Sequence, residues 1–176
     1  PASEGNEATE PRHLVIGRQI GEWTVRRRIG AGGMGIVYEA WQPTIERRVA
    51  IKILKSEPGE LGSASGLIAE ARAANAIGHR GIIDIFSFGR LEGVGPYIVM
   101  EYLEGSPLDE VVHLRAPLSP RETARILDEI LSALAAAHAR GVIHRDLKPS
   151  NVFLVNDPAG GYYVKLLDFG LAKRSE

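Results

Sequence analysis

Two acidic residues and one amide in the last part of the chain have the spacing of a metal-assisted reaction site. Asp146 lies within residues 144–151 (HRDLKPSN), Asn151 closes that stretch, and Asp168 follows further on, immediately before Phe-Gly. A carboxylate in a short loop can accept the proton of an attacking hydroxyl group. Amide and carboxylate oxygens, together with phosphate oxygens, are the ligands that Mg²⁺ prefers. The pattern predicts transfer of a phosphoryl group to a hydroxyl, with Asp146 as the base and Asn151 and Asp168 as metal ligands.

A glycine-rich stretch closer to the N-terminus is a candidate phosphate-binding loop. Residues 30–37 read GAGGMGIV, and glycines let the backbone approach phosphate oxygens closely and donate N–H groups to them. The same glycine spacing occurs in dinucleotide-binding domains, where a helix follows the glycines. Here the residues after Gly35 alternate as a strand does, so a hairpin is the better interpretation. A plain glycine-rich turn without a ligand is the structural alternative.

Two lysines are placed where they could contact phosphate groups. Lys52 lies in the apolar run 49–54 (VAIKIL), where a charged group is costly unless it is paired. For Lys52 the structural alternative is an ordinary solvated surface charge. Lys148 closely follows Asp146, so its ammonium group could stabilise the phosphate during transfer.

The periodicity of apolar residues predicts a mixed framework of strands and helices around these motifs. Predicted strands cover residues 23–29, 36–40, 47–54, 82–88 and 97–100, with shorter strands at 142–143 and 152–155. An Ala-rich helix is predicted over residues 67–77 and ends at Gly78. Residues 101–105 form a connector, and residues 163–167 lead into Asp168.

The clearest helix signal covers residues 119–140. Ser119 and Glu122 have the spacing of a capping box, and Pro120 suits the first helical position. The apolar face predicted for this helix consists of Leu127, Ile130, Leu131, Leu134 and His138. We therefore expect His138 in the core.

Composition and charge argue against several classes of protein. The 176-residue chain has a formal net charge of -1, so no nucleic-acid partner is expected. It contains no cysteine, which excludes disulfides and thiolate metal sites and is typical of a reducing cytoplasm. Residues 1–13 are polar, predict a disordered lead-in and lack the regions of a signal peptide. We expect a cytoplasmic stretch without membrane contact, although a longer protein could be anchored through a later segment.

In combination and in this order, the four motifs resemble a eukaryotic-type protein kinase. The order Asp-Leu-Lys-Pro-x-Asn at residues 146–151 is similar to that of serine/threonine kinases, and those of bacteria are the closest resemblance. The resemblance covers residues 18–174. It implies an α+β, two-lobed kinase fold, with a five-stranded antiparallel N-lobe sheet carrying one helix and a truncated, mainly helical C-lobe. The N-lobe would span residues 14–104, the hinge would lie near 101–105, and the partial C-lobe would span 105–176.

The resemblance also implies roles for individual residues. Lys52 would contact the α- and β-phosphates and pair with Glu70 on the following helix, although a surface glutamate is the commonplace alternative. With Asp146 and Lys148 these two complete the implied catalytic group. The cofactors would be ATP and Mg²⁺, with Mn²⁺ as an alternative ion, and the partner would be a protein substrate. The residues implied in nucleotide binding are Ile29, Gly30, Gly32, Gly33, Gly35, Val37, Ala50, Lys52, Met100, Glu101, Leu103 and Phe153.

A second implied set of residues would align the two lobes. Ala74, Ile85, His144 and Phe169 match a stack of side chains that connects the lobes in related kinases. Histidine titrates near neutrality and so invites an acid–base role. The resemblance instead implies that His144 packs and hydrogen-bonds inside the lobe.

The sequence leaves alternatives to an active kinase. One is a pseudokinase that binds a nucleotide or a partner without catalysis; a dinucleotide-binding oxidoreductase is a more distant one. The chain ends soon after Asp168, whereas the kinases that it resembles continue for about a hundred residues. We therefore expect the helix over 119–140 to leave part of its apolar face bare, which favours self-association. We also expect this stretch alone to bind ATP weakly and to transfer phosphate poorly.

Overall fold

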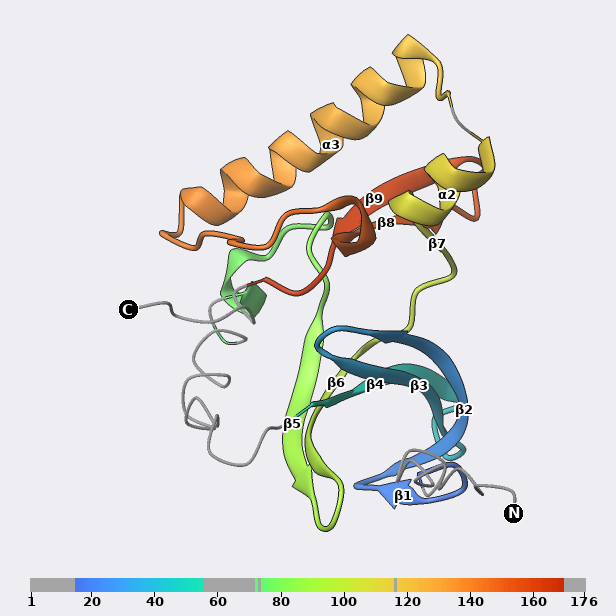
Figure 1. Cartoon of the computed structure of the whole chain (residues 1–176). Helices are drawn as coiled ribbons and strands as arrows, with labels where there is room; N and C mark the ends of the chain where they lie inside the picture. Colours follow the sequence, from blue (N-terminus) through green and yellow to red (C-terminus); the bar gives the residue numbers. More distant parts are fainter. Residues whose placement is uncertain (1–14, 56–71, 73, 116, 170–176) are drawn as a thin grey trace, which may run out of the picture.

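The computed structural model describes residues 15–55, 72, 74–115 and 117–169. Figure 1 shows a sheet of strands β1 to β6 in one part and the helices α2 and α3 with strands β7 to β9 in the other. The chain crosses between the two parts from β6 to β7. The predictions for residues 1–13 and for Glu70 lie outside the described residues.

The larger sheet is antiparallel throughout, with the strand order β1-β2-β3-β4-β6-β5. Its strands are β1 (Gln19–Ile20), β2 (Trp23–Gly32), β3 (Gly35–Gln42), β4 (Arg47–Leu54), β5 (Ile85–Leu91) and β6 (Gly95–Glu101). The prediction of an α+β fold with an antiparallel N-terminal sheet is confirmed. The predicted number of five strands is wrong by one, because β1 adds a sixth. A strand of two residues is too short for its alternation to be recognised in a sequence.

The start of β5 also differs from the prediction. The strand begins at Ile85 rather than at Ile82, because Ile82 forms an isolated parallel bridge with Leu166 of the smaller sheet. The N–H of Ile83 likewise donates to the Leu166 carbonyl at 3.1 Å. The backbone of these residues is therefore bonded to the second part of the molecule and is not available to the larger sheet.

Strand β4 separates the hydrophobic core of this sheet from the space between the two parts. Val49, Ile51 and Ile53 belong to one core cluster on one face of the strand. Ala50 belongs to a different cluster, and Lys52 is also buried, with 6% of its surface exposed. Because side chains alternate along a strand, Lys52 projects from the face that carries Ala50.

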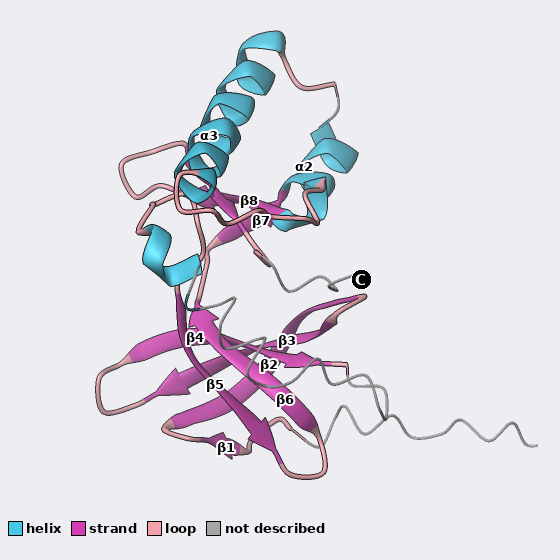
Figure 2. Ribbon diagram, turned by 90° about the vertical axis from the view of Figure 1, so that its left-hand side faces the viewer, coloured by secondary structure: helices cyan, strands magenta, loops and turns pink. Residues whose placement is uncertain are grey.

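Within the described residues, the second part combines a small sheet with the helices α2 and α3, as Figure 2 shows. Its elements are β7 (Gly105–Pro107), α2 (Leu108–Arg115), α3 (Pro120–His138), the 3₁₀ turn η2 (Pro149–Asn151), β8 (Val152–Asn156) and β9 (Tyr162–Leu166). The sheet order is β7-β8-β9. The sequence did not predict β7 or α2. The strand predicted at residues 142–143 is wrong, because the Val142 N–H donates to Ala137 at the end of α3 and Ile143 is 59% exposed.

Helix α3 begins as predicted, but its buried face matches the predicted one only in part: Ile130 is buried as expected. Ser119 is its N-cap, and the Ser119 Oγ accepts a hydrogen bond from the Glu122 N–H at 3.2 Å. The buried residues of the helix are Ile126, Ile130, Ala133 and Ala137. All four belong to the core cluster that also contains Val152, Leu154, Val164 and Leu166 of the small sheet.

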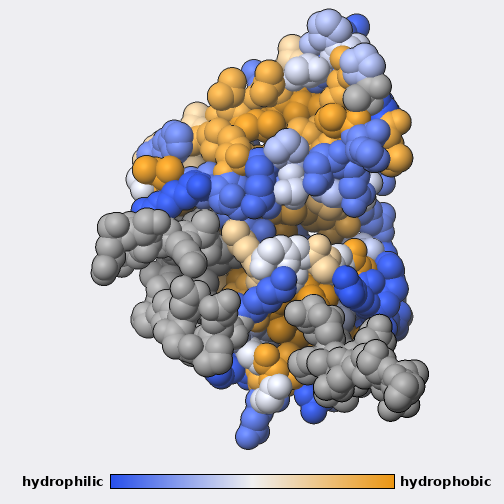
Figure 3. All heavy atoms as spheres, in the orientation of Figure 1, coloured by the Kyte–Doolittle hydropathy of each residue, from blue (hydrophilic) through white to orange (hydrophobic). Residues whose placement is uncertain are grey.

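The larger leucines that guided the prediction lie beside that buried stripe. Leu127 is 51% exposed, Leu131 is 63% exposed, and His138 is exposed rather than in the core. Figure 3 shows apolar side chains gathered in the upper part of the molecule, where α3 lies. The expectation of a partly bare apolar face is therefore met by α3.

Candidate active site

A cavity of about 580 Å³ lies between the two parts of the molecule. Its walls come from the β2–β3 hairpin, β4, the end of β6, the connector after it, α2, η2, β8 and the residues before Phe169. Every residue implied in nucleotide binding lines it: Ile29, Gly30, Gly32, Gly33, Gly35, Val37, Ala50, Lys52, Met100, Glu101, Leu103 and Phe153. Lys148, Asn151 and Asp168 line it too. Segments that are far apart in sequence thus share one cleft.

Lys52 and Asp168 form an ion pair inside this cleft. The Lys52 Nζ lies 2.6 Å from the Asp168 Oδ2, and the two side chains are 8% and 16% exposed. Each charge compensates the other, since an unpaired charge at this depth would be costly. Glu70, the partner predicted for Lys52, lies outside the described residues, and the pairing with Asp168 was not predicted.

The loop before η2 brings the remaining charged residues together. The Lys148 Nζ donates to the Asp146 Oδ2 at 2.8 Å. The Asn151 amide nitrogen donates to the Asp146 backbone carbonyl at 2.8 Å and to the Asp146 Oδ2 at 3.0 Å. Both of these bonds use the nitrogen, so the amide oxygen of Asn151 can serve as a metal ligand. Asp146 is half-buried beside the cleft and is not among its lining residues.

These contacts keep Asp146 ionised. The hydrogen bond from Lys148 is the main reason that the pKa of the Asp146 carboxyl is lowered, and the bond from Asn151 acts in the same direction. Partial burial opposes them but does not outweigh them. A carboxylate that is ionised well below neutral pH can accept a proton throughout the physiological range.

His144 connects this loop to the segment that carries Asp168. It is 2% exposed, and its ring lies 4.5 Å from that of Phe169, centroid to centroid. The His144 Nδ1 accepts the N–H of Asp146 at 3.3 Å, so the proton of a neutral ring must lie on Nε2, which contacts the Leu167 carbonyl at 2.9 Å. Burial lowers the pKa of His144. The imidazole is therefore a neutral structural link, in line with the packing role expected for it.

Two non-glycine residues in these segments have left-handed backbone conformations. Arg145 has a φ of 64° and Asp168 a φ of 57°. Such conformations cost free energy and persist where the surrounding structure enforces them, often at functional sites. Here each residue belongs to one of the two segments that His144 holds together.

The proposed alignment of the lobes by four stacked residues is only partly visible. Ala74 and Phe169 belong to the same core cluster, and Phe169 contacts His144. Ile85 belongs to a separate cluster. The contact between His144 and Phe169 is the part of the stack that the structure shows directly.

The glycine-rich stretch forms the turn between β2 and β3 above the cleft. Gly32 pairs with Gly35 across the hairpin. A Cβ atom at Gly35 would lie 2.1 Å from the Ile53 carbonyl oxygen, so only glycine fits there. A strand follows these glycines where a dinucleotide-binding domain would have a helix, which excludes that alternative for this loop.

Some lining residues were missed by the sequence interpretation. Asp109 and Glu110 line the cleft from the first turn of α2, a helix that had not been predicted. Arg27 lines it from β2, and its guanidinium contacts the Tyr102 hydroxyl at 3.3 Å. The run of arginines around Arg27 was the available signal, but it carries no motif.

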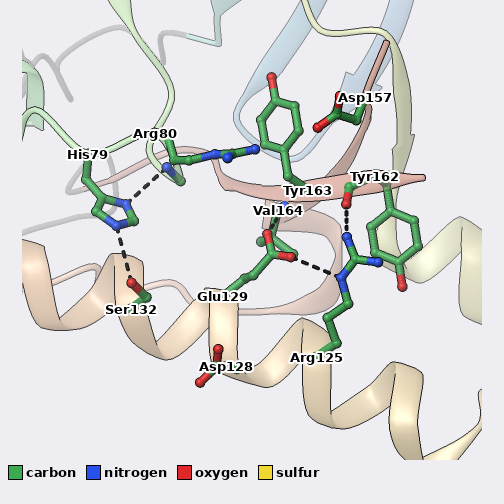
Figure 4. A pocket seen from close by; sticks show the side chains of 11 residues that line it. His79, Arg80, Arg125, Asp128, Glu129, Ser132, Asp157, Tyr162, Tyr163 and Val164 are labelled. Carbon is green, nitrogen blue, oxygen red and sulfur yellow. Dashed lines mark hydrogen bonds and ion pairs between the residues drawn. The ribbon is translucent and has the colours of Figure 1, made fainter. Parts of the chain in front are cut away.

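A second, smaller cavity lies between α3 and β9 (Figure 4). It measures about 320 Å³ and lies between α3, β9 and residues 79–81. The His79 ring accepts the Gly81 N–H at 3.0 Å through Nδ1 and contacts the Ser132 hydroxyl at 3.3 Å through Nε2. The Val164 N–H donates to the Glu129 carboxylate at 2.7 Å. These bonds fasten residues 79–81 and β9 to the same helix.

A model of the protein kinase domain matches residues 23–176 of the chain. The chain belongs to the protein kinase domain family. Kinases of this family generally use ATP and Mg²⁺. Among the described residues, no group of three or more His, Cys, Asp or Glu side chains could by itself hold a metal ion. Asn151 and Asp168, which both line the cleft, carry side-chain oxygens of the kind that bind Mg²⁺.

Bacterial serine/threonine kinases are similar over most of the chain. The serine/threonine-protein kinase Pkn1 of Myxococcus xanthus is 41% identical over 174 residues, which are 97% of this chain and 24% of Pkn1. PrkC of Bacillus subtilis is 38% identical over 161 residues, which are 90% of this chain and 24% of PrkC. The chain thus spans about a quarter of the length of these relatives.

Solved kinase domains share the fold. The crystal structure of the Mycobacterium tuberculosis PknI kinase domain superposes with a TM-score of 0.73 at 29% identity. The match covers 90% of this chain and 63% of that domain. In the described part of the chain, no helix is long and apolar enough to cross a membrane.

Proposed function

We propose that this protein is a serine/threonine protein kinase that transfers the γ-phosphoryl group of ATP to hydroxyl groups of protein substrates. The observation that carries the proposal is the arrangement in the cleft: the Lys52–Asp168 pair lines the cavity together with Lys148 and Asn151, and both of these hydrogen-bond to Asp146 beside it. The hinge between the lobes is proposed to lie within residues 101–105.

The cleft offers a distinct surface to each part of ATP. Val37, Ala50 and Phe153 supply apolar contacts for the adenine ring, and the backbone of Glu101 and Leu103 is suited to bind its polar edge. Backbone N–H groups of the glycine hairpin can bind phosphate oxygens. A few polar groups in a largely apolar slot are typical of ligand sites that fix orientation as well as affinity.

Charged residues at the other end of the cleft suit the triphosphate. Lys52 can bind the α- and β-phosphates, while Asp168 and the amide oxygen of Asn151 would hold Mg²⁺. The ion neutralises negative charge on the β- and γ-phosphates when it is bound. Asp168 thus serves both to fix the Lys52 ammonium group and to ligate the metal.

Asp146 is proposed to accept the proton of the substrate hydroxyl. Its ionised carboxylate and the neighbouring Lys148 ammonium group meet this requirement, because the base is ready and a cation lies close to the transferred group. His144 and Asn151 hold the Asp146 backbone in place. The proton moves from the attacking hydroxyl to Asp146 as the new O–P bond forms and the bond to ADP breaks.

Transfer of labelled phosphate tests this function. The protein at its full natural length is incubated with γ-labelled ATP, Mg²⁺ and a general protein substrate, as wild type and as Asp146→Asn. We expect the variant to lose a factor of about 10²–10⁴ in rate, typical of a positioned base, with its ATP affinity within severalfold. Asp128→Asn on the exposed side of α3 is the matched control and should keep the wild-type rate. A wild type that binds ATP without transfer would instead indicate a pseudokinase.

A further inference from the structure

Lys165 is a buried cation to which the reaction assigns no role. It lies on β9, shortly before Asp168, and is 6% exposed. Its ammonium group donates to the Ile82 carbonyl at 3.1 Å and forms a close ion pair with the Glu101 carboxylate. Lysine is rarely buried to this extent unless it is paired. Lys165 is not among the residues that line the nucleotide cleft.

The partner of Lys165 is the residue at which β6 ends and the connector begins. The Glu101 N–H donates to the Asp84 carbonyl at 3.0 Å, and the Asp84 N–H donates back to the Glu101 Oε1 at 2.8 Å. Glu101 is therefore held through its backbone and its carboxylate at once. Its side chain is 20% exposed, so these bonds are partly shielded from water.

The segment that contains Asp84, residues 81–84, is hydrogen-bonded to the second part of the molecule. The Leu166 N–H donates to the Gly81 carbonyl at 2.8 Å, and the Ile83 N–H donates to the Leu166 carbonyl at 3.1 Å. The contact between His79 and Ser132 in Figure 4 anchors the residues just before this segment to α3. The position of the Glu101 peptide thus depends on β9 and α3 as well as on its own strand.

We propose that Lys165 is a positioning residue that orients the Glu101 peptide toward the adenine edge and so sets the preference of the cleft for a 6-aminopurine. The inference rests on the proposed function, because it requires that the cleft bind ATP. The Glu101 carbonyl is the acceptor suited to the 6-amino group, and an acceptor discriminates well only when it is held in place. Lys165 neutralises the Glu101 carboxylate, and the Asp84 N–H donates a hydrogen bond to it. Together these contacts fix the position of the Glu101 carbonyl.

The test compares two nucleotides in calorimetric titrations of the full-length protein with Mg²⁺. ATP carries the 6-amino group, and purine riboside triphosphate lacks it. Wild type should prefer ATP, and in Lys165→Met this preference should fall by about fivefold, which corresponds to the loss of one net hydrogen bond. Arg121→Met removes an exposed positive charge from α3 and should leave the preference unchanged.

Lys165→Met could fail to fold, because it leaves the Glu101 charge buried without a partner. A second variant keeps the inference testable in that event. Lys165→Met with Glu101→Gln removes both charges, since buried pairs replaced as a whole are often tolerated. The double variant should show the same fivefold fall as Lys165→Met and Glu101→Gln do singly, because all three break one network.

The outcomes separate this inference from the proposed function. If the variants weaken both nucleotides equally, or lower only the unfolding temperature, Lys165 is merely structural and the inference is overturned while the kinase function stands. A wild type that binds both nucleotides with equal affinity overturns the inference in the same way. A wild type that binds neither overturns the proposed function and the inference with it.

Discussion

Burial and hydrogen bonding act differently on the individual charged residues of the cleft. Lys52 and Asp168 are both mostly buried, so each depends on the other for charge compensation. Asp146 instead forms a hydrogen bond with the exposed Lys148 beside the cleft, and this bond lowers the pKa of the Asp146 carboxyl. The motif residues themselves could be predicted, because their chemistry requires those residue types. Lys165 and Asp109 could not, since no motif marks them and their positions follow from tertiary contacts.

At the residue scale, the first prediction concerns the pH dependence of the reaction. Lys148→Met removes the main cause that lowers the pKa of Asp146, so that pKa should rise toward its ordinary value. The carboxylate must be ionised to act as base, and a higher pKa means that it is protonated at a higher pH. The acidic limb of the kcat/KM profile should therefore move upward in pH. The profile of each protein is normalised to its own plateau; a limb that stays in place or moves downward would contradict this prediction.

A second prediction at this scale concerns the buried ion pair. Lys52→Met leaves the Asp168 carboxylate without its partner, so the free energy of unfolding should fall by about 3 kcal/mol. In an Asp168→Asn background the same change should cost much less, because the charge that needs compensation is gone. Urea denaturation of the wild type, both single variants and the double variant measures the coupling. Additive losses would show that the two charges do not stabilise each other.

The secondary-structure elements show which sequence signals determine local structure. The capping box at Ser119 predicted the start of α3, and the alternation after Gly35 predicted β3, because in both cases the signal is local. Strand β1 and helix α2 escaped prediction. The first is very short, and the second has no buried residues that would give it a periodic apolar face. The buried face of α3 was predicted only in part: Ile130 is buried as expected, but alanines are buried where the prediction had relied on the larger leucines.

The glycine hairpin yields a prediction at the element scale. Gly35→Ala places a Cβ atom 2.1 Å from the Ile53 carbonyl oxygen, so β3 and β4 must move apart. We expect a loss of about 1–3 kcal/mol in the free energy of unfolding, as for other overpacked sites. Gly33→Ala is the matched control, since no atom lies within 4 Å of its added Cβ, and it should cost no more than about 0.5 kcal/mol. Equal losses at the two positions would refute the close approach at Gly35.

The cleft exists only in the folded molecule as a whole, because its lining residues come from both parts of the structure. Its walls combine the β2–β3 hairpin of one part with η2 and β8 of the other. The His144 ring hydrogen-bonds to the backbone of both Asp146 and Leu167, and so links the loop before η2 to the segment that carries Asp168. The order of motifs allowed the two-part α+β fold to be predicted. The bonds that fix one part against the other could not be predicted, because they depend on backbone groups such as those of residues 81–84.

A prediction at this scale concerns the exposed apolar side chains of α3. Leu127 and Leu131 are 51% and 63% exposed, so in a polypeptide of these 176 residues they favour self-association. Changing both to Glu should shift the sedimentation profile toward the monomer without lowering the unfolding temperature. Arg121→Glu, on the same helix, should leave the profile unchanged. If the leucine variant sediments like the wild type, another surface mediates any association.

The most direct test of the proposed reaction follows which phosphorus atom of ATP reaches the protein substrate. The full-length protein is incubated with Mg²⁺ and substrate in parallel with γ-labelled and α-labelled ATP, and phosphoamino acids are then separated. Transfer by the cleft predicts label on serine or threonine from γ-labelled ATP alone. Label from α-labelled ATP, or none from either nucleotide, would contradict it.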